Sequence, residues 1–393
     1  MLFDNLETAY KDKSNFDLNR AFFLFKSISN IHIAKILTTV LKFALFSKIP
    51  INYIIKNTIY RHFCGGTNIK ESNDTIEKLW QSKIGTILDY SAEGKESEND
   101  FNKVLRETIK SLNQAKKDKR IPFSVFKPSG LTNFSLLKKI NQNTILTSEE
   151  KKEKDKFIER IEIICQTATK NKVPVFIDAE ESWIQTGIDN IALNMMRRFN
   201  KNGTYIFNTI QLYRTDRLEY IKELIETGKK ENFYLGLKLV RGAYHEKEID
   251  RAKKYNYKCP VYTRKEDSDN DFNLGLEICI KNIDIVSICA GTHNEISSTK
   301  LINLLKKYKI DKNDKRVYLS QLLGMSDNIS YNAAIHGYNV AKYVPYGPVK
   351  DVIPYLIRRA QENTSISGQM GRELSNILKE KKRRKKFKNY KQD

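Results

Sequence analysis

The feature that most constrains the fold is a regular alternation of short strands with helices along most of the chain. Eight runs rich in β-branched or aromatic residues recur, and helical segments separate them. Such alternation favours a parallel sheet, because parallel strands need a long crossover connection. Eight units favour a closed (β/α)8 barrel over an open doubly wound sheet. The predicted strands lie within residues 85–94, 121–130, 173–180, 203–213, 234–244, 285–294, 316–325 and 339–347.

One of the separating helices has a recognisable start. Thr147 and Glu150 form the capping pattern S/T-x-x-E, in which each residue bonds the backbone of the other. Phe157, Ile161 and Ile164 follow at helical spacing. We therefore expect an amphipathic helix from this point towards the third strand.

Polar side chains stand at the carboxyl ends of the predicted strands. In a (β/α)8 barrel, chemistry gathers at these ends and in the loops that follow them. Core packing does not explain why polar residues recur at corresponding positions of successive strands. We expect the following residues to form a polar site at the barrel mouth: Lys127, Asp178, Gln211, Lys238, Arg241, Tyr244, Thr292, His293, Gln321 and Tyr343.

A helix after the last strand carries a second group of polar residues. In "PYLIRRAQEN", Tyr355, Arg358, Arg359 and Glu362 follow helical spacing and share one face. Two guanidinium groups suit the bidentate capture of a carboxylate or phosphate. An Arg–Arg pair on a helix is usually only a solvated face. Here "YVPYGPV" ends the last strand just before it, so we expect the helix to start over the barrel mouth.

The chain divides by composition into three parts. The first part is expected to be a helical arm, with helices in 18–29, 31–46 and 51–63 that stop at Gly65 and Gly66. The last part contains the basic run "KEKKRRKKFKN", which we expect to be solvated or disordered. The predicted boundaries are 1–80 for the arm, 81–378 for the barrel and 379–393 for the basic tail.

The net charge of +22 over 393 residues is high for a globular enzyme. It would suit a polyanion or an anionic membrane surface. Lysine is spread along the whole chain, however, so lysine-rich composition explains most of the charge without a partner. Peripheral contact with a membrane through the basic tail therefore stays open, and no specific nucleic acid partner is expected.

The cysteines and the N-terminus favour a reducing cytoplasm. The five cysteines show no CxxC spacing, so neither a disulfide framework nor a zinc site is indicated, and no metal is expected. The opening "MLFDNLETAYKDK" lacks a basic region followed by an apolar run, so no cleavable signal is expected. The apolar segment "IHIAKILTTVLKFALFSK" contains Lys35 and Lys42, which favours an amphipathic helix over a membrane span.

Several common chemistries are not indicated. The sequence has neither GxGxxG after a strand nor GxxxxGK[ST], so it carries no Rossmann or P-loop signature. The run "YHEKE" is not HExxH, and we interpret His245 as the start of a surface helix. His293 in "GTHN" is ambiguous by itself, because a single histidine at a strand end is often structural. The remaining pattern favours a small anionic substrate beside a large polar cofactor.

Several segments resemble the signature motifs of the proline dehydrogenase family. They are "FIDAEESW", "LKLVRGAYHEKE", "CAGTHN" and "YVPYGPVKDVIPYLIRRAQENTS", and the similarity runs from about residue 85 to "SGQMGRELSNIL". The resemblance implies a flavoenzyme with a (β/α)8 barrel and non-covalent FAD. It implies oxidation of L-proline to Δ1-pyrroline-5-carboxylate, with electrons passed to a membrane quinone, as the first step of proline catabolism. The N-terminal arm matches the family only loosely.

The resemblance also implies roles for individual residues. Arg358 and Arg359 would clamp the proline carboxylate, with Lys127 near it. Asp178 would set the electrostatics between substrate and flavin, and Lys238 would lie beside the isoalloxazine. The substrate pocket would be walled by Tyr244, Tyr343 and Tyr355. Cofactor contacts would come from Gln211, Lys238, Arg241, Gly242, Ala243, Thr292, His293, Gln321 and Glu362, with Thr263, Arg264 and Lys265 as weaker candidates at the adenosine end.

Physical chemistry is consistent with these implied roles. Hydride can leave the ring carbon next to nitrogen only when the amine is neutral, and nearby cations disfavour the protonated amine. Lys127 and the arginine pair would therefore both hold the carboxylate and ease loss of the amine proton. A fixed charge at Lys238 would stabilise negative charge that develops on the flavin.

Three alternative functions stay open. Hydroxyproline is the nearest competing substrate within the family. Another flavin barrel, such as a methylenetetrahydrofolate reductase, would need a folate site, and the "RRAQEN" helix argues against it. A non-catalytic polyanion-binding protein would use the net charge, and its binding would depend steeply on salt. The sequence leaves the oligomeric state open.

Overall fold

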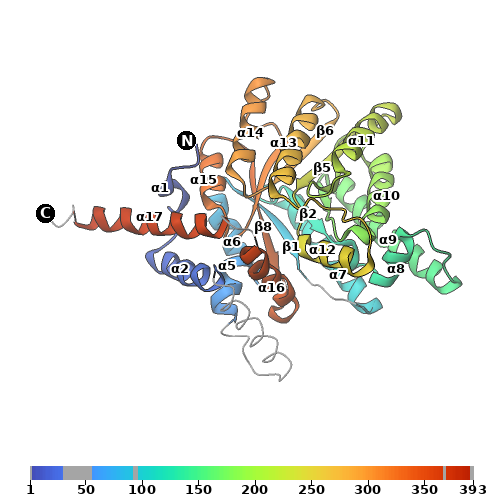
Figure 1. Ribbon diagram of the computed structural model, residues 1–393, viewed down its shortest axis with the longest axis horizontal. Helices are drawn as coiled ribbons and strands as arrows, with labels where there is room; N and C mark the ends of the chain where they lie inside the picture. Colours follow the sequence, from blue (N-terminus) through green and yellow to red (C-terminus); the bar gives the residue numbers. More distant parts are fainter. Residues whose placement is uncertain (1, 30–54, 92–95, 366–368, 390–393) are drawn as a thin grey trace.

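The centre of the molecule is a closed barrel of eight parallel strands in sequential order (Figure 1). The computed structural model describes residues 2–29, 55–91, 96–365 and 369–389, and of 28, 29, 359–365, 369, 370, 388 and 389 it describes the backbone alone. The predicted barrel and the position of every predicted strand are confirmed. The strands are β1 (Gly85–Tyr90), β2 (Phe123–Phe126), β3 (Val175–Ile177), β4 (Ile206–Gln211), β5 (Leu235–Val240), β6 (Val286–Gly291), β7 (Val317–Leu322) and β8 (Val340–Tyr346).

Helices cover the outside of the barrel and alternate with the strands. The helices outside and between the strands are α1 (Leu6–Ala9), α2 (Asn15–Ser29), the π-helix η1 (Lys56–Tyr60), α5 (Arg61–Phe63), α6 (Asn73–Trp80), α7 (Glu98–Lys117), the 3-10 helix η2 (Pro128–Gly130), α8 (Phe134–Asn141), α9 (Ser148–Asn171), α10 (Ser182–Phe199), α11 (Arg217–Glu231), α12 (His245–Tyr255), α13 (Lys265–Lys281), α14 (Glu295–Lys307) and α15 (Asp327–Ile335). Two more follow β8, namely α16 (Val349–Ser365) and α17 (Gln369–Asn389).

Helix α9 shows how local sequence sets these elements. The capping box is present as predicted: the Thr147 side chain accepts from Glu150 N, and Glu150 accepts in return from Thr147 N. The buried side of α9 carries the apolar residues at helical spacing, including Phe157, Ile161 and Ile164. Burial of this stripe between the helix and the sheet is what fixes α9 on the barrel.

The inside of the barrel is filled by aromatic side chains. The rings of Phe123 and Phe176 stack with centroids 4.5 Å apart, and Phe207 meets both edge to face. Tyr343 lies above this group, with its ring centroid 6.3 Å from that of Phe176. The barrel is therefore a packed core, so its interior has no room for a ligand, and we expect one at the carboxyl ends of the strands.

The N-terminal arm packs against the helices that follow β8. Buried residues of the arm, including Leu18, Phe25 and Phe63, form a second core with Val352 and Leu356 of α16. The Tyr60 hydroxyl donates to the Gly347 carbonyl at 2.8 Å, just before α16. The arm thus supports the helix expected to lie over the barrel mouth. The predicted arm helix at 31–46 lies outside the described residues.

The basic segment after residue 379 is not a disordered tail. Through Asn389 it forms the second half of α17, which packs against α1 and α2 at one side of the molecule (Figure 1). Glu380 is fully buried there, where it accepts from Arg383 and Arg384. Disorder was therefore wrong for residues 379–389, because the long-range contacts that order them leave no local pattern in the sequence. Lys382, Lys385 and Lys386 are exposed, in keeping with a solvated segment. None of the helices in the described ranges is long and apolar enough to cross a membrane.

Candidate active site

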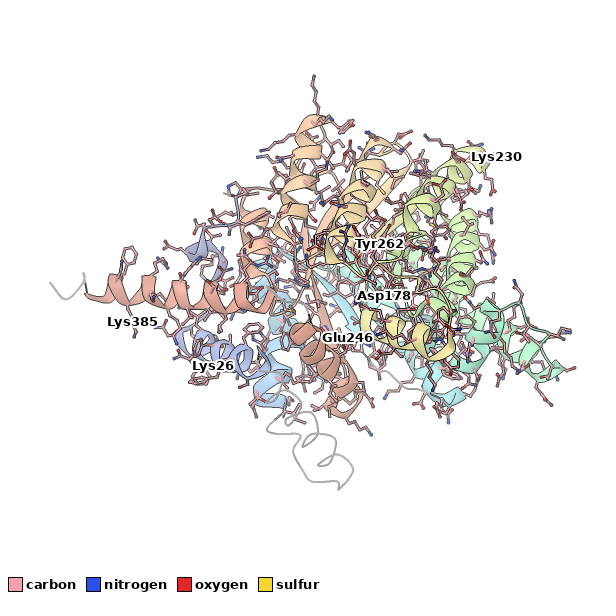
Figure 2. All side chains as sticks on the ribbon, in the orientation of Figure 1. Lys26, Asp178, Lys230, Glu246, Tyr262 and Lys385 are labelled. Atoms are coloured by element: carbon pink, nitrogen blue, oxygen red, sulfur yellow. The ribbon has the colours of Figure 1, made fainter. Side chains whose placement is uncertain are left out.

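A cavity of about 850 Å³ opens at the carboxyl ends of the strands. Asp178 and Glu246 both line it and lie near the centre of Figure 2, at the barrel mouth. The cavity is lined by residues that the sequence predicted. They come from α16 and from seven of the eight strands and the loops that follow them. They are Lys127, Asp178, Gln211, Lys238, Arg241, Gly242, Ala243, Tyr244, Thr292, His293, Gln321, Tyr343, Tyr355 and Arg358.

Three of these residues form a hydrogen-bonded group at the floor of the cavity. Lys238 is buried, and its ammonium group donates to Asp178 and lies 2.5 Å from the Tyr343 hydroxyl. The Tyr343 hydroxyl is also 3.3 Å from Asp178 Oδ1. Burial and the nearby Asp178 charge raise the pKa of Tyr343 well above its usual value, so this phenol stays neutral. The group presents a lysine ammonium paired with a carboxylate, beside a neutral phenol.

The loop after β3 is clamped to its neighbours by two buried carboxylates. Glu180 accepts from the backbone N of Ser129, at 2.7 Å, and from its hydroxyl, which joins this loop to the one that carries Lys127. Glu248 of α12 accepts in the same manner from Ser182 N, at 2.7 Å, and from Ser182 Oγ, at 2.6 Å. The segment that carries Asp178 is thereby held from both sides.

Glu180 also has an unusual pKa. Burial, reinforced by the neighbouring Glu181, raises it to about 7, although the Ser129 hydrogen bonds and the Lys127 charge act in the opposite direction. A carboxyl group that titrates near neutral pH thus lies behind the cavity wall, between two candidate site residues.

The far end of the cavity is built from β5, β6 and the loops after them. Arg241 donates to Asp269 at 2.5 Å, to Thr292 Oγ1 at 2.7 Å and to Ser297 Oγ at 2.8 Å. Gln321 donates to the Thr292 carbonyl at 3.0 Å. A planar cation is therefore held rigidly beside the N-terminus of α14, an arrangement that favours anionic groups.

One observation tests whether a flavin cofactor fits this cavity. Among the described residues, none donates a hydrogen bond to the buried Oε1 of Gln211, which leaves an acceptor that a ring N–H of the cofactor would satisfy. Gly242 has φ +143°, and a Cβ atom added there would lie 2.4 Å from the Tyr213 ring, so the backbone at this position needs glycine. The residues present fit a large polar cofactor with an acceptor and a cationic end.

Helix α16 contributes the candidate substrate residues. Tyr355 is buried and lines the cavity, and the Arg358 guanidinium lies 5.7 Å above the ring centroid of Tyr244. Arg359 and Glu362 belong to α16 by their backbone, but their side chains lie outside the described residues. The structure thus places half of the predicted arginine pair at the cavity.

Some cavity residues were missed or misplaced by the sequence argument. His245 does start α12, but it lines the cavity instead of a surface, with Nε2 2.7 Å from the Tyr262 carbonyl. Arg372 lines the cavity from α17, a helix that the strand-end argument does not reach. Of the three weaker candidates, Thr263 and Lys265 line the cavity, whereas Arg264 does not and instead pairs with Asp267.

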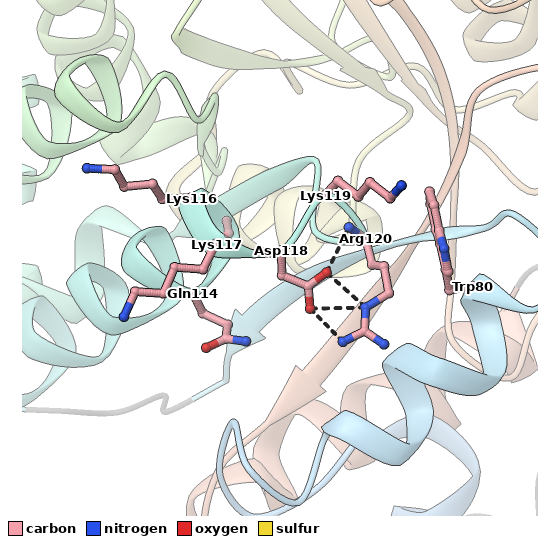
Figure 3. Close-up of a pocket in the computed structure, with 8 residues that line it drawn as sticks. Trp80, Gln114, Lys116, Lys117, Asp118, Lys119 and Arg120 are labelled. Carbon is pink, nitrogen blue, oxygen red and sulfur yellow. Dashed lines mark hydrogen bonds and ion pairs between the residues drawn. The ribbon is translucent and has the colours of Figure 1, made fainter.

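A second, shallow depression lies at the other end of the barrel, near the start of β2 (Figure 3). Lys116, Lys117 and Lys119 surround it, and Arg120 is bound to Asp118 with Nη2 2.8 Å from Oδ2. Arg120 also pairs with Glu77. The Arg120 guanidinium is thus held by two carboxylates, and the other charged residues around the depression are surface lysines. This depression therefore offers no built site for a polyanion.

Comparison with known proteins agrees with the motif resemblance. The family model described as Proline dehydrogenase matches residues 72–372. "Proline dehydrogenase 1, mitochondrial" of Dictyostelium discoideum is 31% identical over 388 residues, which covers 86% of this chain and 68% of that protein. "Carbapenem antibiotics biosynthesis protein CarD" of Pectobacterium carotovorum is 31% identical over 332 residues, which covers 84% of this chain and 85% of that protein.

Solved structures share the fold at lower identity. Proline utilization A of Bdellovibrio bacteriovorus, inactivated by N-propargylglycine, matches with a TM-score of 0.72 at 20% identity. The match covers 94% of this chain but only 40% of that longer protein. A Bradyrhizobium japonicum proline utilization A variant matches with a TM-score of 0.67 at 17% identity, over 81% of this chain and 33% of that one. At this level of identity the likeness establishes the barrel architecture.

Proposed function

The chain belongs to the proline dehydrogenase family, and on this premise we propose that it oxidises L-proline to Δ1-pyrroline-5-carboxylate with FAD as the hydride acceptor. The observation that carries the proposal is the hydrogen-bonded group of Lys238, Asp178 and Tyr343 at the floor of a cavity that Lys127 and Arg358 also line. A small anionic substrate and a polar cofactor can meet there, above a barrel interior that is filled by side chains.

In this proposal the substrate lies under α16. Arg358 and Arg359 hold the proline carboxylate in their planar donor forks, and Lys127 adds a third positive charge. Tyr244, Tyr343 and Tyr355 enclose the ring, so that water is excluded from the reacting carbon. These side chains orient the substrate. The nearby cations also lower the pKa of its amine, which must be neutral when hydride leaves.

The cofactor lies along the opposite wall in this proposal. Bound FAD supplies a two-electron acceptor for the hydride from the carbon next to nitrogen. Gly242 and Ala243 line this wall, and Lys238 holds a positive charge in place without reorganisation. The residues proposed to hold the cofactor are Gln211, Lys238, Arg241, Gly242, Ala243, Thr292, His293, Gln321 and Glu362.

A single observation on purified protein tests this function. The protein should be yellow, and L-proline added without oxygen should bleach the flavin absorbance near 450 nm, in about the ratio of one proline per flavin. D-Proline and glycine should leave the colour unchanged, since neither places a hydrogen of the correct ring carbon against the cofactor. Equal bleaching by trans-4-hydroxy-L-proline would move the assignment to that substrate, and a colourless protein that binds no FAD would overturn it.

The proposal also covers the electron acceptor and the location. We propose that electrons pass to a quinone and that the protein is cytoplasmic with peripheral contact to a membrane. The support is the basic α17 and the aromatic residues of α2 beside it. Curated relatives from Dictyostelium and Arabidopsis carry the word mitochondrial in their names, which describes those proteins.

A further inference from the structure

The C-terminal helix returns to the barrel mouth at its first turns. Arg372 lines the cavity beside His293, and its neighbour Glu373 is buried. Neither residue lies at a strand end. Both belong to "SGQMGRELSNIL", the last segment of the family similarity, but the resemblance assigns neither of them a role. Their contacts nevertheless converge on one candidate cofactor residue.

The guanidinium of Arg372 binds the segment after β6. Its Nη2 donates to the His293 carbonyl and lies 3.4 Å from the Ser326 hydroxyl. Its Nε lies 3.4 Å from Glu295 Oε1, and Glu295 in turn accepts from Asn328 at 2.7 Å. These contacts fix the orientation of the guanidinium at the cavity wall, beside the N-terminus of α14.

Glu373 fixes the other side of the same segment. Its carboxylate accepts from Ser326 N at 2.7 Å and lies 3.2 Å from the Ser326 hydroxyl. The same hydroxyl lies 3.1 Å from Nδ1 of the His293 ring. The backbone of His293 is thus held by Arg372, and its ring is held through Ser326 by Glu373.

The far half of α17 is attached to the molecule independently. Glu380 binds Arg383 and Arg384, and Arg384 donates to the carbonyls of Tyr10, at 2.8 Å, and Lys13, at 2.9 Å. None of these residues lines the cavity. The anchoring of α17 and its contact with His293 can therefore be separated by mutation.

We infer that the start of α17 completes the diphosphate end of the cofactor site, with Arg372 as a binding residue for that anionic group and Glu373 as a positioning residue for His293. The inference rests on the proposed function, because it takes FAD to be the occupant of the cavity. The supporting chemistry is general: Arg241 and Arg372 bring two planar cations to the N-terminus of α14, and although Asp269 and Glu295 pair with them, the donor forks and the helix dipole together suit a diphosphate.

Titration of full-length apoprotein with FAD, followed by quenching of flavin fluorescence, tests the inference. Arg372→Met should weaken FAD binding about tenfold or more, and Arg372→Lys should recover part of the loss, because a charge-assisted hydrogen bond is removed and then partly restored. Glu373→Gln should weaken FAD binding several-fold by loosening Ser326 and His293. Riboflavin, which has no phosphate, should bind equally to all variants.

Glu380→Gln is the matched control, since it alters a buried carboxylate of the same helix away from the cavity. It should lower the unfolding temperature without changing FAD affinity. Equal FAD affinity in Arg372→Met and wild type, or an equal loss in Glu380→Gln, would overturn the inference. Failure of the proposed function is distinct, because then the wild-type protein itself would bind no FAD.

Discussion

Lys238 is the residue whose surroundings bear most directly on the proposed chemistry. Its ammonium group is buried, contacts Asp178 and Tyr343, and lies 5.3 Å from the ring centroid of Phe176. A buried ion pair of this kind is weak evidence for stability, because desolvation of both charges opposes their attraction. The arrangement is better explained by the need for a fixed charge where the proposed cofactor binds.

We predict that Lys238→Met slows reduction of the flavin by L-proline about 100-fold, because a preorganised positive charge is lost. Binding of tetrahydrofuran-2-carboxylate, a proline-shaped anion without an amine, should change little. Stopped-flow absorbance gives the first quantity and ligand titration the second. Lys238→Arg should retain most of the rate, and Lys222→Met, on the exposed side of α11, should behave as wild type. Equal losses of rate and affinity would remove Lys238 from its assigned role.

At the scale of elements, the loop after β3 is held by carboxylates from two directions. Glu180 joins it to the loop after β2, and Glu248 joins α10 to α12. The adjoining residues include Lys127, Asp178 and Tyr244, which come from three different strands. The relative positions of these candidate substrate residues thus depend on two Glu–Ser contacts that the individual strands do not provide.

The raised pKa of Glu180 predicts a pH dependence of stability. Its folded-state pKa is about 7 and its ordinary value 4.5, so folding favours the protonated form. The stabilisation is full below pH 4.5 and is lost as the pH rises through 7. In Glu180→Gln the titrating carboxyl group is absent. The free energy of unfolding of this variant, relative to that of wild type, should therefore rise by up to roughly 3 kcal/mol between pH 4.5 and pH 7.

Urea unfolding of both proteins at about pH 5, 6, 7 and 8 measures this difference. Ser129→Ala removes a hydroxyl that lowers the Glu180 pKa, so the window should move to higher pH in that variant. Parallel stability curves for wild type and Glu180→Gln would show that Glu180 does not titrate in this range.

At the scale of the whole molecule, the arm and α17 form a lobe beside the barrel. Lys26 and Lys381 both lie over the Phe22 ring, at 5.8 and 4.8 Å from its centroid. The next residue, Phe23, is 65% exposed, and its ring meets that of Phe22 edge to face. An exposed aromatic residue among lysines is suited to the surface of an anionic membrane.

We predict that the protein binds vesicles containing about 30% phosphatidylserine and that this binding weakens steeply as salt is raised, because screening reduces the attraction of lysine to anionic lipid. Phe23→Ser and Lys381→Glu should each reduce cosedimentation with these vesicles. Leu274→Ser, which changes an exposed apolar residue of α13 on the barrel, is the control and should have no effect. Equal binding to neutral phosphatidylcholine vesicles, or no effect of either substitution, would contradict a lysine-dependent membrane surface.

The sequence by itself determined the barrel and about half of the cavity wall. Strand positions follow from local apolar runs, and the ends of parallel strands must meet at one rim, so residues as distant as Lys127 and Tyr343 could be placed together from their strand positions alone. Their roles in binding remain predictions. The α9 capping box could also be predicted from the sequence, because it depends on two residues three positions apart.

Only the tertiary structure decided where the remaining segments go. The arm packs under α16, residues 379–389 form a helix with a buried Glu380, and Arg372 reaches the cavity from beyond the last strand. Each of these placements depends on contacts between residues far apart in the chain. Burial of apolar side chains and ion pairing stabilise those contacts, and the local sequence pattern does not predict them. The sequence pattern predicts which residues lie at the end of a strand. Tertiary packing alone determines which other segment of the chain contacts them.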